Sequence, residues 1–366
     1  MRAKMRAVVT SSYRAPSHAS PAHRSVQGNG LAGATIAMRL PEPSVGGKST
    51  RERYPLTGRH ERRQARRVAF GTELRRTPTS GIFGAFQRAA LDRALRAALG
   101  PDFEARIEAV PLHLGSSGVD PFGLDPEWTK YALAGAAILH RRYFRTEVFG
   151  AELVPRGRLL LIANHSGQVP FDAMILGATM FLDVNPPRFI RAMVEKWTQT
   201  LPFVSTLFPR VGQVVGVPEN ARRLLEQDEA LLVFPEGSRG ISKPFSKRYQ
   251  LTEFGLGFMR LAIETKTPIV PVAVVGAEEQ YVSLANLDRV ARFFQMPSAP
   301  LLPQLLLPFG AMPLPVRYRL HFGAPMSFDG DADDDDAIIE AKVARVRGVI
   351  QSMVNRGVHE RKGIFF

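Results

Sequence analysis

Residues 159–172 read LLLIANHSGQVPFD, and they indicate the class of fold. Its first five positions are apolar without alternation, which indicates a short strand buried on both faces of a sheet. The chain then turns through Gly167 and Pro170, and an apolar segment with helical spacing follows from Phe171. The stretch therefore predicts a strand, a polar turn and a helix, which is the repeating unit of α/β domains.

The same succession recurs further along the chain. Strands are predicted at residues 189–193, 231–234, 269–275 and 317–322, and helices at residues 127–143, 219–226, 254–265 and 337–354. This alternation predicts an α/β domain over residues 146–356, with a mixed sheet flanked by helices. Residues 77–145 are predicted as a helical segment. Because residues 84–99 form an amphipathic stripe, this segment either packs on the domain or associates with a membrane.

Residues 1–76 are predicted to be a disordered basic tail, because they are rich in Arg, Ser, Gly and Pro and lack periodicity. The net charge of the chain is +14, and residues 1–67 account for +11 of it, with 12 Arg and 2 Lys against three Glu. A basic patch on the folded domain is therefore not indicated, and nucleic acid is not an expected partner. The tail suits anionic lipid headgroups equally well.

Composition limits the chemistry and the location of the protein. The chain has no cysteine, which excludes disulfides, Cys-ligated zinc and a thiol nucleophile. It has no run of 18 apolar residues that could span a bilayer. We expect a cytoplasmic protein that is peripheral on a membrane. An organelle transit peptide would share the composition of the first forty residues, but it is not the favoured interpretation.

The polar turn after the first strand carries a candidate catalytic pair. A histidine at the carboxyl end of a strand lies where α/β domains place reacting groups. If the turn folds back, the Asp172 carboxylate can accept the His165 Nδ1 proton, which leaves Nε2 free to take a proton from an attacking hydroxyl. Taken alone, a His and an Asp this close are usually loop and cap residues.

Residues 232–240, LVFPEGSRG, form a second strand that runs directly into a polar turn. Glu236 and Arg239 in this turn can bind a polar headgroup, and backbone N–H groups freed by glycine can face an anion. The alternative is an Arg–Glu pair on an ordinary surface turn. Two such turns at the ends of strands in one sheet favour the functional interpretation.

Together these residues resemble the glycerolipid acyltransferases, which include the 1-acylglycerol-3-phosphate acyltransferases and a branch that resembles diacylglycerol acyltransferases. That family pairs an Asn-His…Asp block with a Phe-Pro-Glu-Gly-(Thr/Ser)-Arg block and ends on a Val-Pro-Val strand. The counterparts in this chain are residues 164–172, 234–239 and 270–276, in the same order, and the resemblance covers about residues 147–324.

The resemblance implies that His165 is the general base, that Asp172 orients it, and that Glu236, Gly237, Ser238 and Arg239 belong to the acceptor site. The reaction would move a fatty acyl group from acyl-CoA or acyl carrier protein to a lipid hydroxyl, without a cofactor, a metal or a covalent intermediate. A thioester is already activated, so a positioned base and hydrogen-bond donors for the oxyanion suffice. Lys243 follows the same turn and can either meet a CoA phosphate or a lipid headgroup, or belong to an exposed loop of charges.

Two departures from the family pattern bear on the substrate and the geometry. Six residues separate His165 from Asp172, where the family usually has four. The middle block, residues 212–218, ends at Pro218, where the family has an Arg that grips the acceptor phosphate. This points to a neutral alcohol, such as a diacylglycerol, a monoacylglycerol or a long-chain alcohol. If Arg222 replaces the missing Arg, the acceptor is instead lysophosphatidic acid, as in phospholipid biosynthesis.

Two other functions stay open at this point. A non-catalytic membrane lipid-binding protein would explain both departures. A hydrolase is less favoured, because the chain has no Gly-x-Ser-x-Gly sequence.

Two compositionally biased stretches follow the last motif. Residues 293–318 are apolar, rich in proline and too broken for a helix, so they are predicted either to pack over an acyl channel or to enter a membrane interface. Residues 329–336, DGDADDDD, lack the Glu and Gly positions of a calcium-binding EF-hand. They are predicted to supply favourable negative charge to the start of the helix that follows.

Overall fold

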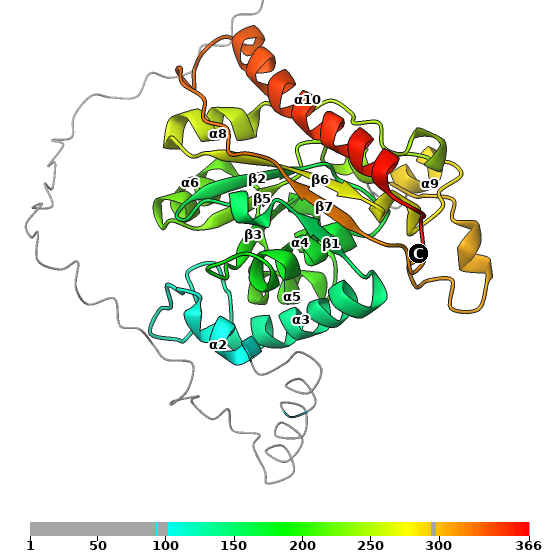
Figure 1. Ribbon diagram of the computed structural model, residues 1–366, viewed down its shortest axis with the longest axis horizontal. Coiled ribbons are helices and arrows are strands. Elements are labelled where there is room, and N and C mark those ends of the chain that lie inside the picture. Colours follow the sequence, from blue (N-terminus) through cyan, green and yellow to red (C-terminus); the bar gives the residue numbers. More distant parts are fainter. Residues whose placement is uncertain (1–92, 94–101, 294–297, 366) are drawn as a thin grey trace, which may run out of the picture. The chain divides into compact units, whose positions relative to one another are not determined.

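A mixed sheet of seven strands forms the centre of the part that the computed structural model describes, which is residue 93 and residues 102–293 and 298–365 (Figure 1). The strand order is β1-β7-β6-β2-β5-β3-β4, and β6 and β7 are antiparallel whereas the other neighbours are parallel. The strands are β1 (Glu147–Phe149), β2 (Leu159–Ala163), β3 (Ile190–Val194), β4 (Val214–Val215), β5 (Ala230–Val233), β6 (Ile269–Val275) and β7 (Arg319–Phe322). The prediction of an α/β domain with a mixed sheet is confirmed.

Strand β2 lies at the middle of the sheet, between β5 and β6. All five of its residues are fully buried, which is why its sequence is apolar at every position rather than alternating. Strand β6 is buried along its whole length for the same reason. Both strands have the bounds that the sequence predicted.

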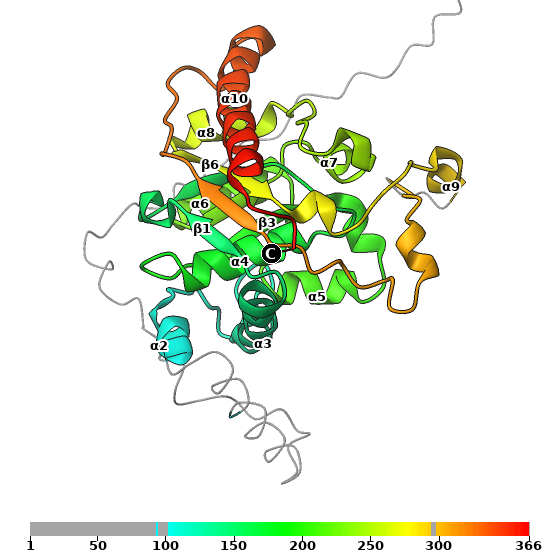
Figure 2. The ribbon, with the colours of Figure 1, turned by 45° about the vertical axis from the view of Figure 1, so that its right-hand side comes forward.

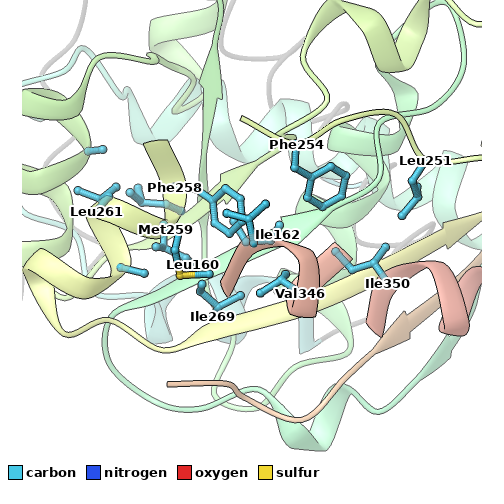
Figure 3. Close-up of a cluster of buried hydrophobic side chains, with 14 of the residues drawn as sticks. Leu160, Ile162, Leu251, Phe254, Phe258, Met259, Leu261, Ile269, Val346 and Ile350 are labelled. Atoms are coloured by element: carbon cyan, nitrogen blue, oxygen red, sulfur yellow. The ribbon is translucent and has the colours of Figure 1, made fainter. Parts of the chain in front are cut away.

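Helices cover both faces of the sheet (Figures 1 and 2). The described helices are α2 (Asp102–Ala109), α3 (Pro126–Ile138), α4 (Phe171–Leu182), α5 (Val204–Arg210), α6 (Pro218–Glu226), α7 (Ser238–Ile241), α8 (Gly257–Thr265), α9 (Asp288–Phe293) and α10 (Asp336–Glu360). Alternate residues of β2 face the two sides. Leu160 and Ile162 pack with residues of α8 and α10, such as Met259 and Val346 (Figure 3), whereas Leu161 packs with α4.

The segment before the sheet packs on α4. The rings of Phe103 in α2 and Phe181 in α4 lie 5.3 Å apart, edge to face. Arg106 donates hydrogen bonds to the carbonyl oxygens of Phe181 and Val184. The helix predicted at 127–143 is α3 with a π-helical turn, Leu139–Tyr143, at its end.

Three sequence predictions concern segments or boundaries that the described residues do not decide. The predicted tail, residues 1–76, lies outside the described residues, and so does the amphipathic stripe at 84–99 apart from Arg93. The domain boundaries near 76 and 146 stay predictions. Among the described residues, no helix is long and apolar enough to cross a membrane.

Candidate active site

The two polar turns found in the sequence lie side by side, because β2 and β5 are parallel neighbours and both turns follow their carboxyl ends. The approach of the turns is close. A Cβ atom added to Gly240 would lie 2.9 Å from His165 Cβ and 3.0 Å from Glu236 Cβ, so only glycine fits at this position. The topology thus joins residues 71 positions apart into one site.

The histidine turn folds back on the start of α4. His165 Nδ1 lies 2.8 Å from Asp172 Oδ2, with the Asp172 side chain completely buried. Gly167 takes a left-handed backbone with φ of 77°, and a Cβ there would lie 2.2 Å from Gln280 Nε2. The turn therefore accommodates the two extra residues between His and Asp without separating the pair.

The Asp172 carboxylate has its orientation fixed by backbone donors. Its Oδ2 accepts from the Ser166 N–H at 2.9 Å, and its Oδ1 accepts from the Ala173 N–H at 2.8 Å. An ionised carboxylate is only an acceptor, so the proton of the shared hydrogen bond lies on His165 Nδ1. Nε2 then has a free lone pair and can accept a proton.

The His165 ring is also held from the side. It stacks on the Phe234 ring of the second turn, with centroids 4.1 Å apart and planes 18° from parallel. The His165 side chain is 13% exposed. Aromatic packing and one carboxylate therefore leave the imidazole a single well-defined position with limited access.

Glu236 joins the two turns instead of extending toward a ligand. Its Oε1 accepts from the His165 N–H at 3.1 Å, and its Oε2 accepts from Thr252 N and Thr252 Oγ1 at 2.8 and 2.9 Å. The side chain is 1% exposed. The structure thus places this predicted acceptor-site residue beneath the site, where it fixes the histidine backbone.

Lys243 is buried between two carboxylates. Its Nζ lies 3.0 Å from Glu278 Oε1 and 3.5 Å from Glu236 Oε2, and the side chain is 7% exposed. Burial raises the pKa of Glu278, while the Lys243 charge acts in the opposite direction. The Glu278 carboxylate also accepts from the Tyr249 N–H at 2.8 Å, so this group holds the chain that follows the second turn.

The remaining predicted residues differ in their contacts, and one of them lies outside the group around the His165–Asp172 pair. Gly237 takes φ of 56°, and the N–H of Ser238 donates to Glu195 Oε1 at 2.8 Å, so both belong to the turn itself. Arg239 is 58% exposed and lies 3.5 Å from Glu253. Arg222 is not brought to this group, because its guanidinium contacts Glu264 at 2.7 Å, near the end of α8 that leads into the start of β6.

Sequence reasoning missed three residues that support the site. Glu195 and Glu278 are described above, and Gln280 follows β6. Gln280 Nε2 donates to the Val169 carbonyl at 3.0 Å, and Gln280 Oε1 accepts from Tyr318 OH at 2.7 Å, so it braces the histidine turn. None of the three lies in a recognisable motif, and only the sheet order brings them to the histidine.

A small hollow opens beside the pair. It is lined by residues of both turns and of the segment after the second turn, among them Gln168, Lys243, Phe245 and Arg248, and by Glu278 and Tyr281 from the segment that follows β6. The Arg248 guanidinium lies over the Phe245 ring, 4.3 Å from its centroid. The lining of the hollow is thus mainly polar, with one aromatic ring beneath the Arg248 guanidinium.

Comparison with known proteins identifies the class. Residues 145–275 match the family model described as Acyltransferase, and this range includes the paired turns and β6. The chain is 35% identical over 260 residues to an uncharacterized protein of Mycobacterium tuberculosis, which covers 69% of this chain and 73% of that protein. The chain therefore belongs to the acyltransferase family, as its motifs predicted.

Two more distant similarities extend the comparison. The chain is 24% identical over 219 residues to the mouse protein named DGAT1/2-independent enzyme synthesizing storage lipids, across 59% of this chain and 60% of that one. The crystal structure of the 1-acyl-sn-glycerophosphate (LPA) acyltransferase PlsC from Thermotoga maritima aligns with 64% of this chain and 83% of that chain, at 17% identity and a TM-score of 0.42.

Proposed function

We propose that this protein transfers a fatty acyl group from acyl-CoA to the hydroxyl of a neutral lipid at a membrane surface. The observation that carries the proposal is the 2.8 Å hydrogen bond between His165 and Asp172 at the carboxyl end of the central strand. Asp172 keeps Nδ1 protonated, so Nε2 takes the hydroxyl proton as the oxygen attacks the thioester carbonyl. The C–O bond forms, the C–S bond breaks, and the proton passes to the departing thiolate.

The cations at the predicted positions support a neutral acceptor. Lys243 is held by two buried carboxylates, Arg239 lies against Glu253, and Arg222 is engaged by Glu264. Position 218, where the family has a phosphate-binding Arg, is the proline that begins α6. A phosphate on the acceptor would therefore compete with acidic partners at each of these cations. The name of the mouse relative, which refers to storage lipids, is consistent with an uncharged acceptor.

The phosphates of coenzyme A are proposed to lie at the rim of the hollow rather than inside it. Arg248 lines the hollow with its side chain 40% exposed and 3.8 Å from Glu279, and the neighbouring Lys247 is exposed, so Lys247 is the cation better placed to meet a phosphate. Acyl carrier protein, whose phosphopantetheine carries a phosphate as well, is the alternative donor.

The test is incorporation of radiolabelled acyl-CoA by purified protein on liposomes that contain diacylglycerol, a long-chain alcohol or lysophosphatidic acid. We expect label in triacylglycerol or wax ester. Label in phosphatidic acid alone would overturn the neutral acceptor but keep the transfer reaction. His165→Ala should abolish turnover, whereas His359→Ala, at an exposed histidine in the last turn of α10, should not.

Two outcomes would favour the alternatives. Liposome binding without product from any donor and acceptor would support a non-catalytic lipid-binding protein. Fatty acid released from acyl-CoA equally fast with and without acceptor would support a hydrolase.

A further inference from the structure

An uncharged loop leaves the sheet next to the candidate site. Residues 293–316 contain no Asp, Glu, Lys or Arg. In the described part of this loop, five large apolar side chains are more than half exposed, and Leu306 and Phe309 reach 89% and 85%. We call these five the apolar tip: Leu305, Leu306, Leu307, Phe309 and Met312. Figure 2 shows this segment, coloured gold to orange after α9, standing clear of the sheet.

The base of the loop is fixed to the segment that follows β6. The Leu284 N–H donates to the Leu301 carbonyl at 3.0 Å, and the Leu301 N–H donates to the Ala285 carbonyl at 2.8 Å. Tyr281 OH donates to the Ala311 carbonyl at 2.9 Å. The apolar tip is therefore held in place by the structure and is not a loose excursion.

Gln280 connects the foot of the loop to the histidine turn. The Gln280 carbonyl accepts from the Leu314 N–H at 2.8 Å, at the foot of the loop. The Gln280 side chain donates to Val169 in the histidine turn at 3.0 Å. The loop also ends where β7 begins, and Arg319 of β7 pairs with Val275 at the carboxyl end of β6. The apolar tip thus projects from the same end of the sheet as the His165 turn.

Part of the backbone of the tip is hydrogen-bonded within the loop itself. The N–H groups of Leu305, Leu307, Gly310 and Met312 donate to carbonyl oxygens three residues earlier, at 2.9–3.1 Å. Internal pairing of this kind suits a lipid environment, which offers backbone groups no water. A protein partner that added a strand would instead need free backbone groups.

Phe309 is difficult to explain by folding alone. Its φ of 62° lies in the left-handed region, which is unfavourable for a bulky residue. Asn, Asp or Gly would fit that backbone better, and the exposed ring gains little from packing. A phenylalanine here is consistent with a contact outside this part of the chain.

We propose that the apolar tip inserts into the interfacial layer of a lipid bilayer and holds the histidine turn at the membrane surface. The inference rests on the proposed lipid acceptor, which must reach His165 from the bilayer. A helix next to the loop contributes charge, because Arg289 of α9 is exposed and can meet anionic headgroups. The apolar tip is uncharged and protrudes, which suits insertion into lipid, because leucine and phenylalanine side chains partition favourably into the membrane interface.

The absence of cysteine allows a direct test in the full-length protein. Leu306→Cys, labelled with an environment-sensitive fluorophore, should show a blue-shifted emission on vesicles of phosphatidylcholine and phosphatidylserine. Ile338→Cys is the matched control, since Ile338 is 47% exposed in the first turn of α10 and its neighbour Asp336 contacts Arg260 rather than the loop. An equal response from both labels would overturn the proposal.

A second measurement tests the energetic contribution of the tip. Leu306→Asp with Phe309→Asp should weaken vesicle binding at least about a hundredfold, because each buried large apolar side chain contributes about tenfold. The melting temperature should be unchanged, since both side chains are exposed and Asp tolerates the left-handed backbone at 309. Full vesicle binding by the double variant would overturn the proposal. If the double variant is also a monomer where the unmodified protein is an oligomer, the partner of the apolar tip is a second copy of the chain.

Failure of this proposal and failure of the proposed function are separable. Vesicle binding is measured without acyl donor, and His165→Ala should bind vesicles like the unmodified protein while it forms no product. An unmodified protein that acylates a lipid yet does not place Leu306 in the bilayer would refute the docking surface alone.

Discussion

Replacement of Asp172 by Asn tests the proposed role of the His–Asp pair with almost no change in shape. The carboxylate accepts three hydrogen bonds, from His165 Nδ1, Ser166 N and Ala173 N, at 2.8–2.9 Å. If the Asn NH2 group replaces Oδ2, it faces the Ser166 N–H and forces His165 to protonate Nε2, which then cannot act as a base. If the NH2 group replaces Oδ1, it faces the Ala173 N–H and the tautomer is kept.

Both orientations predict a large loss of activity. In either one the imidazolium formed during the reaction no longer meets a negative charge. We expect kcat to fall by about 10²–10⁴, the range that a general base and its orienting carboxylate contribute. One buried N–H group also loses its acceptor, which should cost about 1–3 kcal/mol of the free energy of unfolding.

The assay is steady-state acyl transfer, with urea denaturation in parallel. Asp183→Asn is the matched control, because Asp183 contacts His140 Nε2 at 3.2 Å at the opposite end of α4 from Asp172. The control should leave kcat within about threefold of the unmodified value, in keeping with a pair outside the site. A fall of less than about tenfold for Asp172→Asn would refute the role assigned to the carboxylate.

Three further changes are expected to have distinct effects. Gly240→Ala should lower kcat at least about tenfold, because its Cβ would lie 2.9 Å from His165 Cβ. The control is Gly348→Ala in α10, where no atom lies within 4 Å of the added Cβ. This control should raise the free energy of unfolding by about 0.5–1 kcal/mol. Glu236→Gln should lower that free energy by about 1–3 kcal/mol in urea denaturation, since its NH2 group must face a backbone N–H on one side. Burial raises the pKa of Glu278 above its ordinary 4.5, so the folded state binds the carboxyl proton more tightly than the unfolded chain does. The protonated carboxyl therefore stabilises the fold at low pH, and this stabilisation is lost as the pH rises from 4.5 through the folded pKa. Glu278→Gln should remove that decline from a series of urea denaturations at increasing pH, and an unchanged pH dependence would contradict the assignment.

The amino-acid sequence was enough to predict the class of fold and to locate the candidate pair, His165 and Asp172. Strands β2 and β6 are apolar at every position because both faces are covered, and that pattern is visible in the sequence itself. The His165 turn could be located for the same reason, since it directly follows β2. Short-range chemistry of this kind depends only on neighbours along the chain.

The order of the strands and the partners of the charged groups could be seen only in the folded structure. Strands β1 and β4 have three and two residues, too few to show a pattern, and the antiparallel pairing of β7 depends on the path of the chain before it. The charge of Arg191 would predict exposure, yet it is 1% exposed beside Asp120. These arrangements come from residues far apart in the sequence, and no local pattern encodes which of them the sheet brings together.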